Sequence, residues 1–243
     1  MEKPTYKELL DAGVHFGHLK KKWNPKMAPY IFMERKGIHI IDLNRTLECI
    51  DRAANALRQM AKSGKKIMFV ATKKQAREIV ATAARSVGMP YVTDRWLGGM
   101  MTNFTTIRRS VKKMQNIERM LQDGTFSSIT KKEKLTLSRE LNKLEKVLGG
   151  IANLNRLPSA IFIVDIQHEH IAVAEAQRLG IRTFGIVDTN SDPNLVDFPI
   201  PGNDDASKSV AIITNYMAEA IRQGLEERKA AKPEKEAAQE AEA

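Results

Sequence analysis

The chain has one cysteine, two tryptophans and no long apolar run among its 243 residues. With Cys49 alone, no disulfide can form within the chain, which is typical of proteins in a reducing compartment. Cys49 lies beside Leu47 and Ile50, and these neighbours predict a buried structural side chain rather than a reactive thiol. No stretch approaches the roughly 20 apolar residues of a membrane span, and the first residues lack the apolar core of a signal peptide. We therefore expect a cytoplasmic protein without membrane contact.

The motifs of nucleotide-using enzymes are also missing. Dinucleotide binding needs glycines directly after a strand, so that the backbone can approach a pyrophosphate. The loops at 71–75, 165–168 and 188–191 are not glycine-rich, and no Walker-type lysine motif occurs. No Ser-His-Asp or Cys-His arrangement is suggested either. We expect no enzymatic activity and no cofactor. The alternative, a nucleotide-using enzyme, predicts a ligand that is retained through purification.

Candidate metal ligands are few. His15 and His18 are three residues apart, and a metal site needs three or four ligands, so we expect none at these histidines. A group of acidic residues lies in the C-terminal loops and comprises Asp188, Asp192, Asp204 and Asp205. Such carboxylates could hold a magnesium ion. Helix caps and Asx turns are the roles that the sequence favours for them.

Charge is the unusual feature of the composition. The chain has 39 Lys and Arg against 29 Asp and Glu, which gives a net charge of +10 and a pI near 9.6. Such an excess predicts a polyanionic partner, either a nucleic acid or an anionic membrane surface. The tail at 226–243 holds six acids and four bases, so the remainder carries 35 − 23 = +12. We expect this tail to continue a helix and then fray.

The hydrophobic pattern predicts an α/β fold. The apolar runs at 67–71 and 160–164 are typical of strands covered on both faces. Shorter strand signals and helical periodicities alternate with them at 38–41, 43–62, 75–87, 169–179, 183–187 and 206–223. This alternation favours a Rossmann-like parallel sheet sandwiched by helices. We expect residues 1–103 and 150–225 to form this discontinuous domain.

Residues 104–149 interrupt the alternation. Apolar residues recur at spacings of three and four from 104 to 121 and again from 137 to 151, and Gly124 and a Thr130–Glu133 capping box lie between the two stripes. This pattern predicts an inserted antiparallel coiled-coil helical hairpin. A helix pair packed into the core is the alternative. A diglycine at each end supplies backbone freedom where the hairpin leaves and rejoins the domain.

Two basic segments favour RNA as the polyanion. Residues 14–37 form a basic N-terminal arm, which we expect to be irregular from 20 to 36, and the second segment opens the hairpin. The side chains predicted to contact RNA are Lys20, Lys21, Lys22, Trp23, Lys26, Arg35, Lys36, Arg95, Trp96, Asn103, Arg108, Arg109, Lys112 and Lys113. The cations would neutralise phosphates, and the two tryptophans would brace the arms or stack on bases. No RNA-recognition motif, zinc finger or helix-turn-helix is visible, so phosphate and shape contacts are the expected mode.

Five blocks carry a family resemblance. They read LLDAGVHFGH (9–18), WNPKM (23–27) followed by YIF (30–32), GIHIIDL (37–43), RWLGGMMTNF (95–104), and PSAIFIVD (158–165) followed by GIVDTN (185–190). In this order they resemble the S-two (S2) family of bacterial small-subunit ribosomal proteins. The segments span most of the chain, and the run from 95 to 104 is the most distinctive.

The resemblance implies a structural, non-enzymatic role in translation. Family members have a Rossmann-like domain with a coiled-coil insertion and lie between head and body of the small ribosomal subunit. The implied partners are 16S rRNA, other small-subunit ribosomal proteins, and the messenger-binding S-one (S1) protein, which the family helps to recruit. We therefore expect a cytoplasmic chain within the small subunit that is not a homo-oligomer. A free RNA chaperone, which binds many RNAs without staying in one particle, is the remaining alternative.

Overall fold

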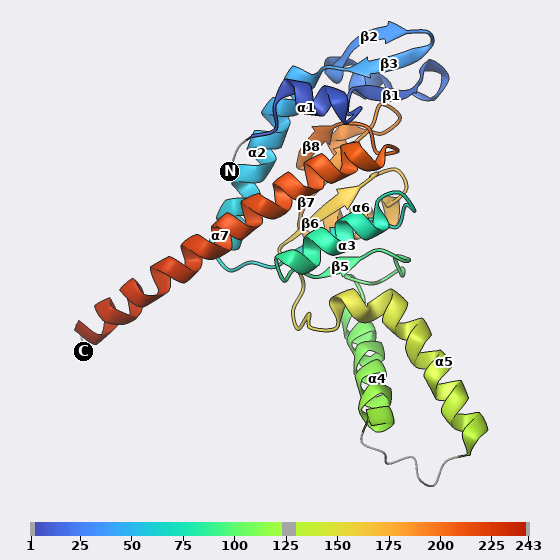
Figure 1. The fold of residues 1–243 in the computed structure, drawn as a ribbon, viewed down its shortest axis with the longest axis vertical. Coiled ribbons are helices and arrows are strands. Elements are labelled where there is room, and N and C mark those ends of the chain that lie inside the picture. The colour runs from blue at the N-terminus through green and yellow to red at the C-terminus, as the bar shows by residue number, and fades with distance from the viewer. Residues whose placement is uncertain (1–2, 123–129, 242–243) are drawn as a thin grey trace.

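The computed structural model describes residues 3–122 and 130–241 and contains two β-sheets, a larger one flanked by helices and a smaller one at one end of the molecule (Figure 1). The larger sheet has five parallel strands in the order β5-β4-β6-β7-β8. Its strands are β4 (Ile67–Val70), β5 (Tyr91–Val92), β6 (Ala160–Val164), β7 (Arg182–Val187) and β8 (Phe198–Pro201). The predicted α/β class, with a parallel sheet flanked by helices, is confirmed.

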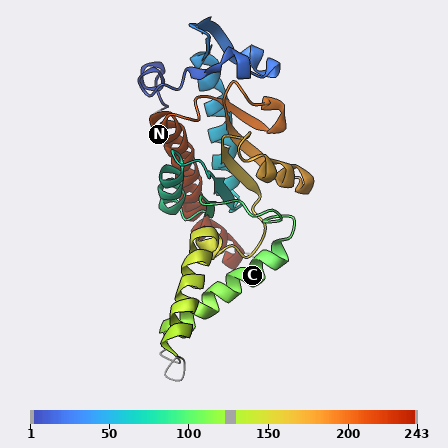
Figure 2. The same ribbon diagram turned by 90° about the vertical axis from the view of Figure 1, so that its right-hand side faces the viewer.

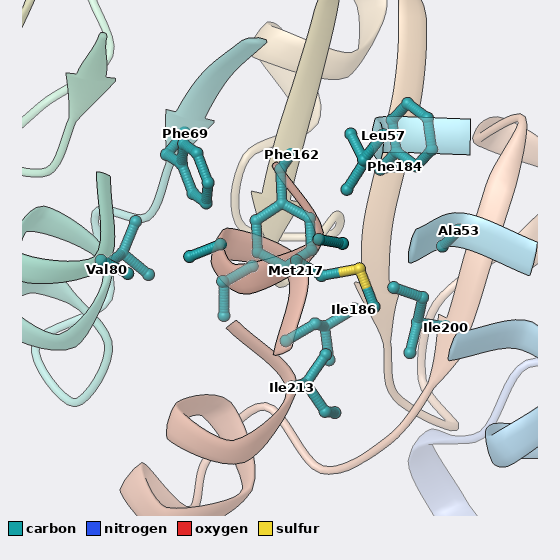
Figure 3. Close-up of a cluster of buried hydrophobic side chains, with 14 of the residues drawn as sticks. Ala53, Leu57, Phe69, Val80, Phe162, Phe184, Ile186, Ile200, Ile213 and Met217 are labelled. Atoms are coloured by element: carbon teal, nitrogen blue, oxygen red, sulfur yellow. The ribbon is translucent and has the colours of Figure 1, made fainter. Parts of the chain in front are cut away.

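Helices cover both faces of this sheet because its central strands are apolar on both sides. One face packs against α2 (Leu43–Lys62), α3 (Arg77–Ser86) and α7 (Ser207–Ala241). On this side the rings of Phe69, Phe162 and Phe184 project from β4, β6 and β7 toward α7 (Figure 3). The opposite face packs against α6 (His170–Leu179) and the first turns of the helical insertion. The two buried faces explain the unbroken apolar runs in the sequence.

The two edge strands were not predicted. β5 has only two residues, and β8 reads Phe-Pro-Ile-Pro, so neither shows a strand period in the sequence. Proline cannot donate to a sheet ladder and is tolerated on edge strands. β8 pairs only with β7, and β5 only with β4. The loop expected after 187 therefore contains a strand that the proline signal concealed.

The N-terminal region departs from the prediction. β1 (Phe16–Leu19), β3 (Ile38–Ile41) and β2 (Ile31–Arg35) form a separate antiparallel sheet in that order. The expected irregular course of residues 20–36 is therefore wrong at β2, and the strand at 38–41 is present but lies outside the parallel sheet. Lys36 and Gly37 link β2 to β3 with φ values of 51° and 76°. Two residues with positive φ are the geometry of a tight hairpin turn, which the pair Lys-Gly signals only weakly.

The insertion consists of α4 (Phe104–Gln122) and α5 (Lys131–Leu148), followed by the short η4 (Gly149–Ile151). Both helices extend from the end of the molecule opposite the three-stranded sheet (Figure 1, Figure 2). The Thr130–Glu133 capping box that begins α5 is confirmed, and a second capping box, Thr5–Glu8, begins α1 (Tyr6–Asp11). Gly124 lies outside the described residues. The coiled-coil character of the pair stays a prediction.

Helix α7 is longer than the predicted 206–223 and continues to Ala241. Its C-terminal end extends beyond the sheet (Figure 1). It crosses α2 closely at Gly224, where a Cβ would overlap the main-chain oxygen of Arg58. Within residues 3–122 and 130–241, no helix has both the length and the apolar character needed to cross a bilayer.

Candidate nucleic-acid interface

A buried glutamate holds the loop that leads into α4. The Glu175 carboxylate, on α6, is 7% exposed and accepts five hydrogen bonds of 2.7–3.0 Å. Oε1 accepts from the Trp96 indole and the Gly99 amide, and Oε2 from the Met101 amide and from both the amide and hydroxyl of Thr102. Burial raises the pKa of this carboxyl, but the hydrogen bonds outweigh burial and leave the pKa below its ordinary value. The base of the insertion is therefore a fixed joint.

The two tryptophans differ in their surroundings. Trp96 is 7% exposed, and its indole N–H is taken by Glu175, so it braces the loop. Trp23 is half-buried, and its ring lies 5.0 Å from that of His39, centroid to centroid. Of the two predicted roles, bracing the arm or stacking on a base, Trp96 therefore has the bracing role. Trp23 is only half-buried, so both roles stay predictions for it.

Arg108 turns inward from the hairpin. One terminal nitrogen of its guanidinium donates to the main-chain oxygen of Leu154 at 2.9 Å, and the other donates to Asn155 Oδ1 at 2.9 Å. This predicted phosphate ligand therefore ties α4 to the loop before β6. A guanidinium has five N–H groups in a fixed geometry, and two of them are used in these contacts. Fewer donors of Arg108 are therefore available to RNA.

Several predicted cations are already paired within the protein. Lys20 lies 2.6 Å from Glu34, and Lys26 lies 2.6 Å from Asp192. Lys113 of α4 forms an ion pair with Glu140 of α5. The predicted cations that are exposed, with no ion pair among the described residues, are Lys21, Lys22, Arg35, Lys36, Arg95, Arg109 and Lys112. This subset is best placed to meet phosphates. The amide-bearing candidate, Asn103, is exposed at the start of α4.

The carboxyl end of the parallel sheet gathers a histidine and several carboxylates. His18 of β1 lies with Nδ1 3.0 Å from Asp188 Oδ2 and Nε2 3.5 Å from Asp205 Oδ2. The strand comes this close because Gly17 has no Cβ, which would lie 2.6 Å from Thr189 Cγ2. Hydrogen bonding to Asp188 raises the pKa of His18. Two groups of residues that are separate in the sequence are thus joined in space.

Lys73 is the counter-ion of this acidic cluster. Its Nζ lies 2.6 Å from Asp204 Oδ1, 2.6 Å from Asp205 Oδ1 and 3.2 Å from Asp165 Oδ2. Burial lowers the pKa of Lys73, but the hydrogen bonds to Asp204 and Asp205 raise it further than burial lowers it. Burial, followed by the nearby charges of Asp165 and Asp188, raises the pKa of Asp204 to about 7.

Three of these residues could hold a metal ion. One ligand atom each from His18, Asp188 and Asp204 lies within 4.8 Å of the others. Asp188 and Asp204 are 1% and 0% exposed, and Asp204 Oδ2 accepts no hydrogen bond from any residue that the structure describes. An imidazole nitrogen with two carboxylate oxygens suits zinc or manganese better than magnesium. Of the acidic residues singled out in the sequence, Asp192 instead caps η5 (Pro193–Leu195), as the cap interpretation predicted.

In the crevice where an α/β enzyme would bind a nucleotide, one of the protein's own carboxylates accepts the hydrogen bonds of the loop after β4. The strand order places this crevice between β4 and β6, where connections leave in opposite directions. There the buried Glu169 carboxylate accepts from the Thr72 amide at 2.7 Å and from the Thr72 hydroxyl at 2.6 Å. An internal carboxylate therefore takes the donors that a phosphate would need.

Comparison with known proteins decides the family. The family model described as "Ribosomal protein S2" matches residues 9–224. The chain belongs to the ribosomal protein S2 family. It is 64% identical to the small ribosomal subunit protein uS2 of Cytophaga hutchinsonii, over 94% of this chain and 90% of that protein. It is 60% identical to the uS2 protein of Parabacteroides distasonis and 61% to that of Bacteroides thetaiotaomicron, each over 99% of this chain and 87% of the relative.

S2 proteins are structural, non-enzymatic ribosomal components, so the role of this chain is structural. The contact of Glu169 with Thr72 between β4 and β6 agrees with that role. It also shows why the sheet alone is a poor guide to function, since one fold hosts many activities.

An exposed apolar surface on this S2 chain was missed by the sequence analysis. Phe32 and Met33 of β2 are 69% and 49% exposed, and Phe16 and Leu19 of β1 are 48% and 53% exposed. Large apolar side chains gathered on one small sheet mark an interaction site. No pattern in the sequence indicated this surface, because β1 and β2 lack a recognisable strand period and their exposed faces could not be assigned.

Proposed function

We propose that the chain is a structural constituent of the small ribosomal subunit that binds 16S rRNA through phosphate and shape contacts. The exposed, unpaired cations of the arm and of α4 support this proposal most directly. The insertion carries eleven bases and five acids between residues 104 and 146, half of the excess charge outside the tail. Basic groups on a projecting arm can reach phosphates that a compact surface would not meet.

In this proposal the chain acts as three parts. Residues 1–103 and 150–225 form the α/β domain with its basic arm, residues 104–149 form a coiled-coil hairpin, and residues 226–243 form a charged tail. The fixed joint at Glu175 supports a hairpin that approaches RNA as a rigid arm. A rigid arm loses less conformational entropy on binding than a flexible one.

We further propose that the chain contacts neighbouring ribosomal proteins and helps to recruit the S1 protein. The exposed apolar surface of β1 and β2 supports a protein partner, because RNA offers little apolar area to side chains such as Leu19 and Met33. The surface lies at the opposite end of the molecule from the hairpin (Figure 1). RNA and protein contacts would therefore occupy separate ends of the chain.

Sedimentation of the tagged chain from a cell lysate, at moderate and at high salt, tests the proposal. Co-migration with small subunits in equal amounts is the expected result. A chain that stays at the top of both gradients, in the presence of small subunits, would overturn it. For S1 recruitment, small subunits carrying Phe32→Ala should retain the chain but lose S1, while Leu135→Ala, which changes a 52% exposed apolar side chain of the hairpin, serves as the control.

A further inference from the structure

The two ends of the parallel sheet carry opposite charge. The carboxyl ends of the strands lead into the acidic cluster of Asp165, Asp188, Asp204 and Asp205. At the amino ends of the strands, basic side chains stand just before the strand or at its first residue. Lys65 and Lys66 stand directly before β4, and Arg182 begins β7. This second group was not among the predicted RNA contacts, because its members are scattered through the sequence.

The strand register brings these scattered cations to one edge. Ile67 is paired with Ala160, and Ala160 with Arg182, so all three lie in one row across the sheet. Neighbouring strands are about 4.8 Å apart, which puts the row's two ends about 10 Å from each other. Further cations join this edge from the helices and loops. The amino-edge surface, as we define it, comprises Lys65, Lys66, Arg85, Arg156, Arg182 and Arg228.

These side chains are exposed, although Arg85 lies 3.7 Å from Glu78 and Lys66 Nζ donates to the main-chain oxygen of Gly88 at 3.2 Å. In the part of the chain that the structure describes, no ion pair involves Lys65, Lys66, Arg156 or Arg182. Asp197, the acid near Arg182, instead accepts hydrogen bonds from the Thr183 amide and hydroxyl. This differs from the N-terminal arm, where two of the predicted lysines are neutralised by internal acids.

Other contacts fix the surface in place. The guanidinium of Arg228 packs directly on Gly64, where a Cβ would lie 2.6 Å from its Cζ. Arg85 donates from Nε to the Tyr91 hydroxyl at 2.9 Å. The loop that carries Arg156 is held at its preceding residues by the inward-turned guanidinium of Arg108. Cations held in place lose little entropy when an anion binds.

The surface is also hollowed where it meets the hairpin. Two adjoining pockets of about 250 and 500 Å³ share Arg85, Tyr91, Gly149 and Gly150 in their walls. Lys66 lines the first pocket and Lys146 of α5 lines the second, so cations face both recesses. Glu145 is the one acidic side chain lining either pocket.

We propose that the amino-edge surface is a second RNA-binding surface, which contacts backbone phosphates beside the base of the hairpin. This inference rests on the proposed rRNA-binding function and extends it. RNA is favoured over an acidic protein because the surface is continuous with the basic hairpin through Lys146, and because the gathered apolar side chains lie on the three-stranded sheet instead. Phosphates from the same RNA segment would then meet the hairpin and the sheet edge together.

Salt-dependent binding to small subunits that lack this protein tests the proposal. The variant Lys66→Gln/Arg156→Gln/Arg182→Gln removes three amino-edge charges, and Lys7→Gln/Arg52→Gln/Lys208→Gln removes three exposed charges elsewhere. We expect the first variant to flatten the slope of log K against log [salt] by about 2–3 units, since each lost phosphate contact is worth about 0.7–0.9. The second should match the unaltered chain. Equal slopes for both variants would overturn the inference, provided that both unfold like the unaltered chain.

A crosslinking measurement separates RNA from protein as the partner. A photoreactive amino acid at position 182, in the full chain within small subunits, should attach to 16S rRNA. Attachment to a ribosomal protein alone would overturn the inference. If the proposed rRNA-binding function were wrong, the unaltered chain itself would not bind small subunits. This result is distinct from a failure of the amino-edge surface alone.

Discussion

The indole N–H of Trp96 donates a hydrogen bond to Glu175 across 3.0 Å, and this contact joins the loop before the hairpin to helix α6. The two residues are 79 positions apart in the chain. The same carboxylate receives four further hydrogen bonds from that loop. A tryptophan that stands beside cations in the sequence is thus a structural brace, held by a residue that no motif indicated.

Glu175→Gln should destabilise the protein by about 2–4 kcal/mol. In glutamine an NH2 group replaces one of the two carboxylate oxygens. The donors that bond this oxygen in the unaltered chain, at least two of them, then lose their acceptor. Urea unfolding of both proteins measures the difference. Glu118→Gln, on the exposed side of α4, is the control and should leave the midpoint unchanged. Equal midpoints for all three proteins would show that the joint does not contribute to stability.

The effect of Glu175 should depend on pH. Its pKa is lowered in the folded state, so its contribution is fully present above the unfolded pKa of about 4.3 and is lost as pH falls through the folded value. The difference in unfolding free energy between the unaltered chain and Glu175→Gln should therefore be constant from pH 6 to 7 and narrow below about pH 4. A difference that grows on acidification would contradict this assignment.

Gly150→Ala should destabilise the protein by about 1–3 kcal/mol, because a Cβ at this position would overlap the main-chain oxygen of Tyr91. Gly98→Ala is the matched control, since nothing lies within 4 Å of a Cβ built there. Thermal unfolding of the two variants measures the contrast. Similar melting temperatures would mean that η4 and β5 can separate at little cost.

Lys21→Ala/Lys22→Ala should flatten the salt dependence of binding to small subunits by about 1–2 units of log–log slope. Both lysines are exposed, and neither forms an ion pair within the described residues. Lys20→Ala/Lys26→Ala is the paired control, since these lysines already neutralise Glu34 and Asp192. A larger effect for the control pair would show that the internal ion pairs open when RNA binds.

Zinc should bind the full chain at one site formed by His18, Asp188 and Asp204 and raise its melting temperature. The affinity should increase from pH 6 to pH 8, because the raised pKa values of His18 and Asp204 mean that both ligands must first lose protons. Calorimetric titration measures both effects. His18→Ala should abolish binding, whereas His170→Ala, which changes an exposed histidine that contacts the main-chain oxygen of Gln167, should not. Unchanged binding in His18→Ala would exclude this site.

The sequence predicted the elements whose signal is local. The apolar runs of β4 and β6 and the Thr130–Glu133 capping box depend on neighbouring residues, and each is found where expected. β5 and β8 could not be predicted in this way, because a two-residue strand and a proline-rich edge strand owe their conformation to the pairing strand. The family motif, by contrast, was visible without any fold.

The candidate site was less predictable than the fold. Ion pairing decides which of the predicted lysines are neutralised within the protein, and Glu34 and Asp192 lie 14 and 166 positions from the lysines that they neutralise. The approach of His18 to Asp188 depends on β1 lying against the end of β7, and no spacing in the sequence shows it. The amino-edge cations follow from strand register, which sequence patterns leave undetermined when a strand is buried on both faces.

The pairing of β4 with β6 has a consequence for how the chain is made. Ile67 is in register with Ala160, and 160 − 67 = 93 residues separate them, with the whole hairpin in between. At a synthesis rate of about 5–20 residues per second, the apolar β4 waits roughly 5–20 s for that neighbour. During this interval β5 can pair with one edge of β4. The other edge keeps unpaired main-chain N–H and C=O groups, which favour aggregation. We therefore expect the nascent chain to need chaperones that shield the unpaired edge of β4 until β6 has been synthesised.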